Sequence, residues 1–244
     1  MTQFPMVLAK LPEMISLNIS NNSQWSAEEV YKGLNAIANG PAKEKLQILY
    51  VRDNNLREVP ESFRNLKKIG LLDLAQNQIG TIHPFGKEVA PAQLYLDNNK
   101  LTSLPADGNG LFCTMDDVET FSATYNKFTK FPNIFSAKSK FTIKSVDFSY
   151  NEIDGFEGEE DGTFKGLNIE QLSLAANKFT KFPKCLGTTG SLVAYIILRG
   201  NMIDEIPEGS FSGKYSTSMT SLDLTYNKLS KLPKDFTAEQ LPYI

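Results

Sequence analysis

Few side chains in this sequence could carry out nucleophilic, acid–base or metal chemistry. The 244 residues include one histidine, His83, and two cysteines, Cys113 and Cys185. A zinc site needs more histidine and cysteine ligands than this chain has. A Ser-His-Asp or Cys-His catalytic group needs a nucleophile held next to the histidine. No nucleophile is placed beside His83, so we interpret it as a loop histidine. Because phosphate-binding glycine loops and CxxC or HExxH motifs are also missing, we predict no catalytic residue, cofactor or metal site.

The densest group of charges, residues 154–162, contains five carboxylates. An EF-hand loop alternates its oxygen ligands and ends in a glutamate, and Phe156 stands here at the third position. We interpret the segment as a solvated acidic loop. Calcium binding by this loop is the alternative that the sequence leaves open.

Two aspartates, Asp73 and Asp97, fall on neighbouring predicted strands. Strand geometry places their Cα atoms about 8 Å apart, and the two carboxyl groups of an inverting glycosidase lie ~6.5–9.5 Å apart. We expect both side chains to project from an open sheet, where no wall raises one pKa above the other. We therefore predict that the protein is not an enzyme.

The composition excludes several other classes of protein. Hydrophobic residues make up 41% of the chain and charged residues 22%, which fits a chain with a core. The 25 Lys and Arg against 28 Asp and Glu give a net charge of −3. With no basic run, this argues against a nucleic acid as the partner. No apolar stretch approaches the ~18 residues of a membrane span, so we predict no membrane insertion.

A repeat of 22 to 32 residues runs through the chain. Apolar residues occupy the positions eight, five and three before a recurring asparagine, and most repeats have two more after it. The stretch before each asparagine alternates as a half-buried strand does, and a parallel neighbour can follow only after a crossover. We predict that these asparagines form a buried column that pairs backbone groups: Asn22, Asn54, Asn77, Asn99, Asn126, Asn151, Asn177, Asn201 and Asn227.

The consensus LxxLxLxxNxLxxLP resembles the leucine-rich repeat. The resemblance implies an α/β solenoid, in which a right-handed superhelix carries a parallel β-sheet on its concave side. Loops, 3₁₀ turns and short helices would form the convex side. We expect one domain over residues 1–244, with about nine repeats and with both ends truncated from a longer array. The repeat lengths and the FxxFP pattern are similar to cell-surface leucine-rich repeat proteins of Bacteroidetes, which implies an extracellular or cell-surface location.

Two local features complete the predicted fold. Ser26 and Glu29 have the spacing of a capping box, and the apolar spacing that follows predicts a helix over residues 26–39. Cys113 and Cys185 lie three repeats apart, about 14 Å for strands ~4.8 Å apart. A disulfide needs Cα atoms within ~7 Å, so we predict no bond between them.

The positions seven, six, four, two and one before each asparagine should point away from the core. We call this side of the predicted sheet the open face; in a solenoid it is the concave side. Six of the nine tyrosines and none of the 16 phenylalanines fall there, with seven acidic and three basic residues. Tyrosine combines a large rigid ring with a polar tip, which suits recognition. The predicted ligand-binding residues are Tyr50, Arg52, Asp73, Tyr95, Asp97, Tyr125, Asp147, Tyr150, Tyr195, Arg199, Asp223 and Tyr226.

These features favour a non-catalytic binding module that recognises a protein or another macromolecule through the open face. One alternative is a glycan-binding surface protein, in which tyrosine rings stack on sugars. Another is the substrate-recognition domain of a larger enzyme, such as a bacterial effector ligase with leucine-rich repeats.

Overall fold

The computed structural model describes residues 3–86, 88–105, 118–134, 142–158, 164, 167–188, 192–212, 218–234, 236–239 and 241–243. The chain divides into two compact units, Met1–Asn126 and Lys127–Ile244. Each unit is a parallel β-solenoid, and we describe them separately. The expectation of a single domain over residues 1–244 stays a prediction.

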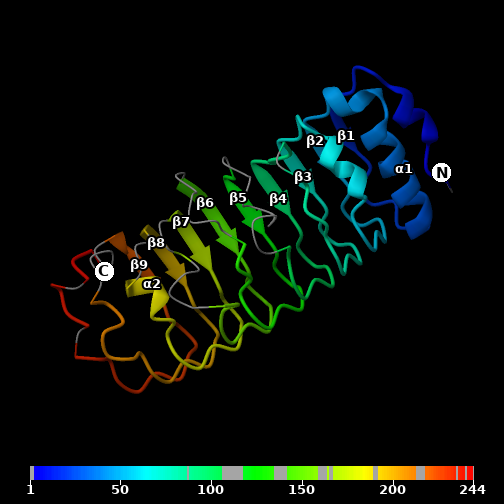
Figure 1. Ribbon diagram of the computed structural model, residues 1–244. Coiled ribbons are helices and arrows are strands. Elements are labelled where there is room, and N and C mark those ends of the chain that lie inside the picture. The colour runs from blue at the N-terminus through cyan, green and yellow to red at the C-terminus, as the bar shows by residue number, and fades with distance from the viewer. Residues whose placement is uncertain are drawn as a thin grey trace. The chain divides into compact units, whose positions relative to one another are not determined.

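The first unit contains five short strands that pair in parallel in the order of the sequence (Figure 1). Their register aligns Leu17, Leu49, Leu72, Leu94 and Phe121, all of which point into the core. The strands are β1 (Ser16–Asn18), β2 (Ile48–Tyr50), β3 (Leu71–Asp73), β4 (Gln93–Tyr95) and β5 (Thr120–Ser122). Between them lie the 3₁₀ helices η1 (Met6–Lys10), η2 (Pro41–Glu44) and η3 (Glu61–Asn65) and the helix α1 (Ala27–Asn39).

The second unit repeats the arrangement with four parallel strands in its described part. These are β6 (Thr142–Asp147), β7 (Asn168–Ser173), β8 (Leu192–Ile197) and β9 (Ser221–Asp223), and a short helix, α2 (Cys185–Thr188), lies between β7 and β8. Buried phenylalanines fill this unit, and the ring of Phe131 lies 4.8 Å from that of Phe148 and 5.2 Å from that of Phe164. The two units thus confirm the predicted solenoid of parallel strands with 3₁₀ turns and short helices.

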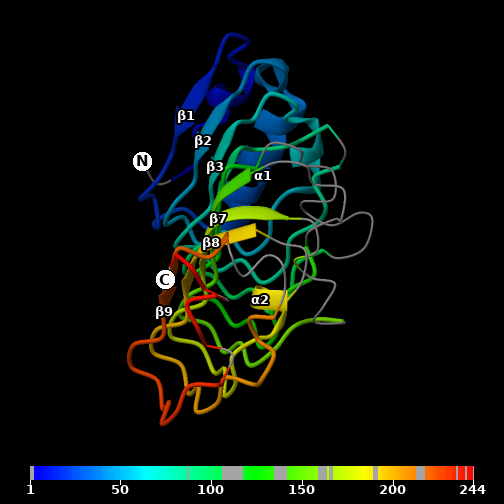
Figure 2. The same ribbon diagram turned by 90° about the vertical axis from the view of Figure 1, so that its left-hand side faces the viewer.

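The helix predicted over residues 26–39 is α1, with Ser26 as its N-cap. The Ser26 hydroxyl accepts a hydrogen bond from the Glu29 N–H, and the Glu29 carboxylate accepts one from the Ser26 N–H. The helix packs against η1, η2 and η3, and Figure 2 shows it to one side of β1, β2 and β3. A Cβ on Gly33 would lie 2.3 Å from the Phe4 ring, so the close contact of helix and N-terminal segment requires glycine.

The column of asparagines is present in both units, and it joins successive turns of the chain. Asn77 is 8% exposed, and its amide donates to the carbonyls of Val51 at 2.9 Å and Leu74 at 3.0 Å. Its Oδ1 accepts from the N–H groups of Asn54 and Leu56, both at 3.0 Å. In the second unit Asn201 donates to Leu174 and Leu198 and accepts from Phe179. Seven of the nine asparagines are buried as predicted, whereas Asn22 and Asn227, the first and the last, are half-buried.

Asn54 differs from the other column residues because the first repeat leaves the pattern. Elsewhere Oδ1 accepts from the residue two positions after the preceding asparagine, as Asn77 does from Leu56. After Asn22 the chain enters α1 instead, and the buried Oδ1 of Asn54 has no hydrogen-bond partner among the described residues. Because α1 follows Asn22, the hydrogen bond that would join the first repeat to the Asn54 Oδ1 is not formed.

None of the described helices is long and apolar enough to cross a bilayer.

Replacing Asn77 by alanine should lower the free energy of unfolding by about 3 kcal/mol, because it leaves several buried backbone groups unpaired at ~1–3 kcal/mol each. Urea unfolding followed by circular dichroism measures the change. Gln78→Ala, at the exposed neighbouring residue, is the control and should change stability by less than ~0.5 kcal/mol. Equal effects of the two substitutions would show that the column is not what stabilises the turn.

Candidate binding face

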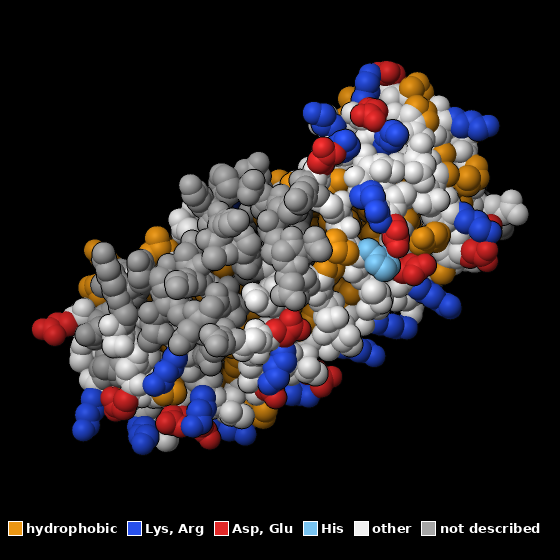
Figure 3. Space-filling view, viewed as in Figure 1, with side chains coloured by type: hydrophobic (Ala, Val, Ile, Leu, Met, Phe, Trp, Pro, Cys, Tyr) orange, Lys and Arg blue, Asp and Glu red, His pale blue; other side chains and the backbone are white. Residues whose placement is uncertain are grey.

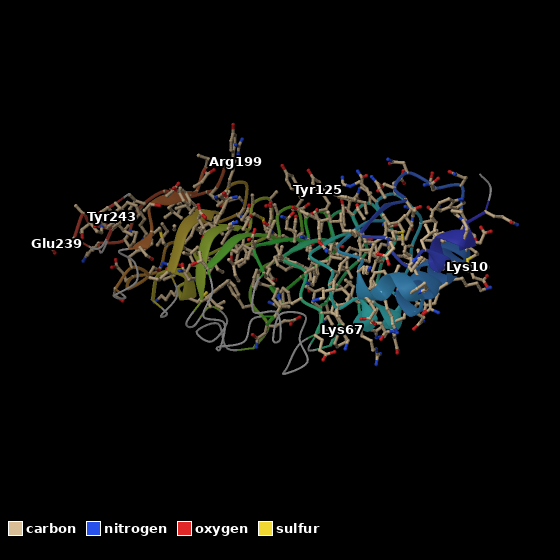
Figure 4. All side chains as sticks on the ribbon, turned by 90° about the horizontal axis from the view of Figure 1, so that it is seen from above. Lys10, Lys67, Tyr125, Arg199, Glu239 and Tyr243 are labelled. Atoms are coloured by element: carbon tan, nitrogen blue, oxygen red, sulfur yellow. The ribbon has the colours of Figure 1, made fainter. Side chains whose placement is uncertain are left out.

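Four tyrosines of the open face are exposed. The exposed fractions are 54% for Tyr125, 52% for Tyr150, 45% for Tyr195 and 75% for Tyr226. Figure 4 shows the Tyr125 side chain standing clear of the ribbon. Tyr50 and Tyr95 are half-buried on β2 and β4. The fold thus separates the two aromatic types, because the described phenylalanines are buried or half-buried.

Asp73 does not project freely from the sheet, contrary to expectation. Its side chain is nearly covered, with the residue 7% exposed, and Oδ2 lies 3.2 Å from the Nε of Arg52. Its Oδ1 accepts a hydrogen bond from the N–H of Ala75 at 3.0 Å. Arg52 lies two residues after the end of β2, and its guanidinium pairs with the carboxylate. The sequence predicted only on which side of the sheet Asp73 lies and did not reveal this partner.

Asp97 is held by the strand that follows it. Its Oδ1 accepts hydrogen bonds from the Ser122 hydroxyl, from the Thr124 N–H at 2.9 Å and from the Thr124 hydroxyl at 2.7 Å. Three donors on one oxygen fix the orientation of the carboxylate before any ligand arrives. Such a fixed acceptor suits a recognition surface, because less side-chain freedom is lost on binding.

Tyr95 lies in a partly buried, negatively charged environment. Its hydroxyl is 3.4 Å from Oε1 of Gln93. Burial raises the pKa of Tyr95 above its ordinary value, and the charges of Asp73 and Asp97, with a smaller effect of Tyr50, act in the same direction. The phenol therefore stays neutral at physiological pH.

Several aspartates of the open face also shape the backbone at the end of their strands. At the position four before the column asparagine, the side chain accepts a hydrogen bond from the N–H two residues later. The pairs are Asn18 with Ser20, Asp73 with Ala75, Asp147 with Ser149, and Asp223 with Thr225. These Asx turns bend the chain out of the strand, so part of the aspartate pattern on this face is structural.

The residue before each column asparagine has a positive φ angle. Glycine adopts this left-handed region freely and asparagine and aspartate tolerate it, whereas most other residues adopt it only with strain. The nine residues are Asn21, Asp53, Gln76, Asn98, Tyr125, Tyr150, Ala176, Gly200 and Tyr226, with φ between 51° and 71°. Sequence reasoning missed this feature, although Asn21, Asn98 and Gly200 at one repeat position were a signal for it. Three of the exposed tyrosines are therefore held in a strained backbone conformation.

Arg199 and Tyr226 form a stacked pair on the open face of the second unit. The guanidinium carbon of Arg199 lies 4.6 Å from the centre of the Tyr226 ring, and Figure 4 shows the Arg199 side chain projecting from the ribbon. The carboxylate of Asp223 accepts from the Thr225 hydroxyl at 2.6 Å and from its N–H at 2.9 Å. These two hydrogen bonds, with a smaller effect of Arg199, lower the pKa of Asp223.

The segments after the asparagines carry ion pairs instead of tyrosines. In the second unit Lys130 pairs with Asp154 at 2.7 Å, Lys178 with Glu152 at 2.5 Å, and Lys181 with Glu205 at 2.8 Å. In the view of Figure 3, acidic and basic side chains are likewise intermingled. Exposed pairs of this kind contribute little to stability. Because each of these lysines is paired with a carboxylate, the described parts of the segments after the asparagines carry charges of both signs side by side.

The other candidates for chemistry are placed as follows. His83 is exposed next to the bridge residue Thr81, consistent with a loop histidine. Cys185 is buried in α2 and Cys113 lies outside the described residues, so the absence of a disulfide between them stays a prediction. The acidic segment 154–162 is described only as far as Gly158. Within the part of the chain that is described, no group of acidic, histidine and cysteine residues could hold a metal ion.

Known proteins that are similar to this chain in sequence and structure are leucine-rich repeat proteins. The family model of the leucine-rich repeat matches residues 45–66. A solved leucine-rich repeat protein from Bacteroides thetaiotaomicron is 36% identical over the whole chain, with a TM-score of 0.87. One from Bacteroides eggerthii is 38% identical, also over the whole chain, with a TM-score of 0.85. The protein is built of leucine-rich repeats.

This leucine-rich repeat chain is also similar to human lumican, with 28% identity over 221 residues, which is 82% of this chain. It spans 62% of the length of lumican, and 30% and 41% of the two Bacteroides chains. The predicted resemblance to Bacteroides leucine-rich repeat proteins is thereby confirmed.

Replacing Tyr150 by asparagine should raise the free energy of unfolding by ~0.5–1 kcal/mol, because asparagine tolerates a positive φ better than tyrosine. Tyr195→Asn is the matched control. Tyr195 is a similarly exposed tyrosine within β8, where asparagine is disfavoured, and this substitution should lower stability. Thermal and urea unfolding measure both changes. A loss of stability in Tyr150→Asn equal to that in Tyr195→Asn would contradict the assignment of strain.

Proposed function

We propose that this chain is a non-catalytic binding module that recognises a protein ligand through its open face, outside the cell or on its surface. The observation that carries the proposal is the set of exposed tyrosines on that face, Tyr125, Tyr150, Tyr195 and Tyr226. Exposed aromatic rings next to oriented polar groups are typical of protein recognition surfaces. The similarity to lumican and to the two Bacteroides proteins supports a binding role and a location outside the cell.

A protein ligand fits the face better than a nucleic acid does. Solved complexes of other proteins with this fold hold both kinds of ligand, a peptide hormone on the Arabidopsis receptor kinase HAESA and an ssRNA on TLR13. The open face here carries seven acidic and three basic residues. A polyanion gains affinity from phosphate contacts with Lys and Arg, and an acidic surface repels it.

Glycan binding is the second candidate, and one observation in the first unit favours it. The paired register places Tyr50, Asp73 and Tyr95 in one row across β2, β3 and β4. Two strand spacings of ~4.8 Å put the tyrosines about 10 Å apart. Between them stands Arg52, whose partly exposed guanidinium could donate hydrogen bonds to sugar hydroxyls. Aromatic rings stack on the apolar faces of sugars, so this row suits a saccharide.

Selection from a random peptide display library and binding to a glycan array, run in parallel, test the proposal. Peptides should be enriched, and the double variant Tyr150→Ala and Tyr195→Ala, both in the second unit, should weaken their binding at least about tenfold, as truncation of a central aromatic residue does. Tyr243→Ala, at a 67% exposed tyrosine outside the open face, is the matched control and should change nothing.

The outcomes separate the two candidates. A glycan signal that is lost in the double variant Tyr95→Ala and Tyr125→Ala, without any enriched peptide, would favour glycan binding over protein binding. Enriched peptides that are insensitive to the open-face substitutions would overturn the proposed surface. Silence in both assays would overturn the proposed function.

A further inference from the structure

Two repeats of the second unit share the pattern Asp-x-Ser/Thr-Tyr-Asn, at residues 147–151 and 223–227. In the two repeats between them, Ala176 and Gly200 stand at the positions equivalent to the tyrosines, and Arg199 precedes Gly200. The strand register aligns Asp147, Ser173, Ile197 and Asp223 in one row. Three residues further along each turn, Tyr150, Ala176, Gly200 and Tyr226 form a second row. The N–H groups of the first three donate hydrogen bonds of 2.8–2.9 Å to carbonyls of the next turn.

These two rows form a slot on the open face, which we call the DY slot. Its walls are Asp147 with Tyr150 on one side and Asp223 with Tyr226 on the other. Its floor is Ser173, Ala176, Ile197 and Gly200. Three strand spacings of ~4.8 Å set the walls about 14 Å apart.

The floor of the DY slot is accessible at three of its four residues. Gly200 is exposed, Ala176 and Ile197 are half-exposed, and Ser173 is buried with its hydroxyl bonded to that of Ser149. A Cβ on Gly200 would meet only backbone atoms of Ala176, at 3.7 and 3.8 Å, which is ordinary contact. The walls stand above this floor, with Tyr150 52% and Tyr226 75% exposed.

The backbone gains nothing from tyrosine at the walls. Tyr150 and Tyr226 have φ of 57° and 56°, where asparagine or glycine would be less strained. Asn21 and Asn98 occupy the equivalent positions in the first unit. Backbone strain kept at an exposed position is typical of a functional site.

We propose that the DY slot binds an extended polypeptide segment with basic side chains at positions i and i+4, one at each Asp–Tyr wall. This inference rests on the proposed function and names the chemistry of the ligand. Extended chains rise ~3.4 Å per residue, so side chains at i and i+4 lie about 14 Å apart on the same face. That distance matches the spacing of the walls. The side chain at i+2 then lies over Ser173 and Ile197.

The charge of the walls selects basic side chains. Asp223 accepts two hydrogen bonds from Thr225, which lower its pKa and keep it ionised at neutral pH. A carboxylate beside an exposed aromatic ring attracts an ammonium or guanidinium group through both charge and cation–π interaction. The Tyr226 ring already holds a guanidinium, that of Arg199 at 4.6 Å.

The direction in which Arg199→Met changes the affinity distinguishes a basic ligand from an acidic or neutral one. A basic ligand at the Asp223 wall competes with Arg199 for the ring and the carboxylate, so Arg199→Met should strengthen its binding. An acidic ligand would pair with Arg199, and the same substitution would weaken it. A neutral saccharide would lose a hydrogen-bond donor and would also bind more weakly.

Fluorescence anisotropy at low ionic strength with labelled synthetic peptides tests the inference. The probe is Gly-Lys-Ser-Leu-Ser-Lys-Gly with both ends blocked, and one control peptide has Glu for both Lys. A second control has the two Lys three residues apart. The probe should bind at least about fivefold more tightly than either control, because only its spacing and charge fit both walls.

Variants of the protein locate the binding. Asp147→Asn and Tyr150→Asn should each weaken the probe at least about fivefold, whereas Arg199→Met should strengthen it. Tyr150→Asn should also raise the melting temperature, so its loss of binding cannot come from unfolding. Tyr243→Ala, at an exposed tyrosine outside the open face, is the control and should leave the affinity unchanged. Tyr95→Ala reports whether the probe binds in the first unit instead.

The possible failures are distinguishable. If the probe does not bind, or binds no better than the Glu peptide, the inference is wrong, while peptides enriched by display would still support the proposed function. If Tyr95→Ala weakens the probe and Tyr150→Asn does not, the basic segment binds elsewhere on the open face. If Arg199→Met weakens binding, the DY slot does not select basic side chains.

Discussion

The asparagine amide that links one turn of the chain to the next is the interaction on which the rest of this structure depends. Most of these amides donate to carbonyls of their own turn and of the turn before, and most accept from a backbone N–H of that preceding turn. Buried backbone groups are costly when unpaired, so each turn must present an asparagine at the same place. Regular stacking of turns therefore follows from a repeated local need of the backbone.

The column also determines the backbone on either side of it. For its amide to point inward, the chain must leave the strand sharply, and each residue before the asparagine adopts a positive φ. Asp73, Asp147 and Asp223 assist the bend through their Asx turns. The open face is thus built on a framework whose geometry does not depend on the particular side chains that it displays.

Different residues of this fold provide stability and recognition, because the side chains of the open face can vary without a change in the core or in the asparagine column. Tyr125, Tyr150 and Tyr226 occupy positions where asparagine would be less strained, and all three are more than half exposed. The core and the column supply stability that tolerates such local cost. Natural proteins often keep strained residues where activity or binding needs them, at the expense of maximal stability. The two Asp–Tyr walls of the DY slot are the clearest case in this chain.

The aspartates show that one side chain can serve the fold and the surface together. The Asp73 carboxylate is nearly covered, and the Nε of Arg52 lies 3.2 Å from its Oδ2. Asp223 turns its strand and remains half-exposed beside the Tyr226 ring. Aspartates at the same repeat position therefore differ in exposure, and the side chains of the neighbouring turn determine how exposed each carboxylate is.

The repeat, the parallel strands, the helix at residues 26–39 and the side of the sheet that carries the tyrosines were determined by the sequence alone. These features are local and periodic: each repeat contacts mainly its neighbours, so the pattern of one turn predicts the next. The burial of Asp73, the strain at Tyr150 and the stacking of Arg199 on Tyr226 were decided only by the tertiary structure. They depend on which side chains face each other across strands and on the backbone angle that the column imposes, and neither can be seen in a single repeat.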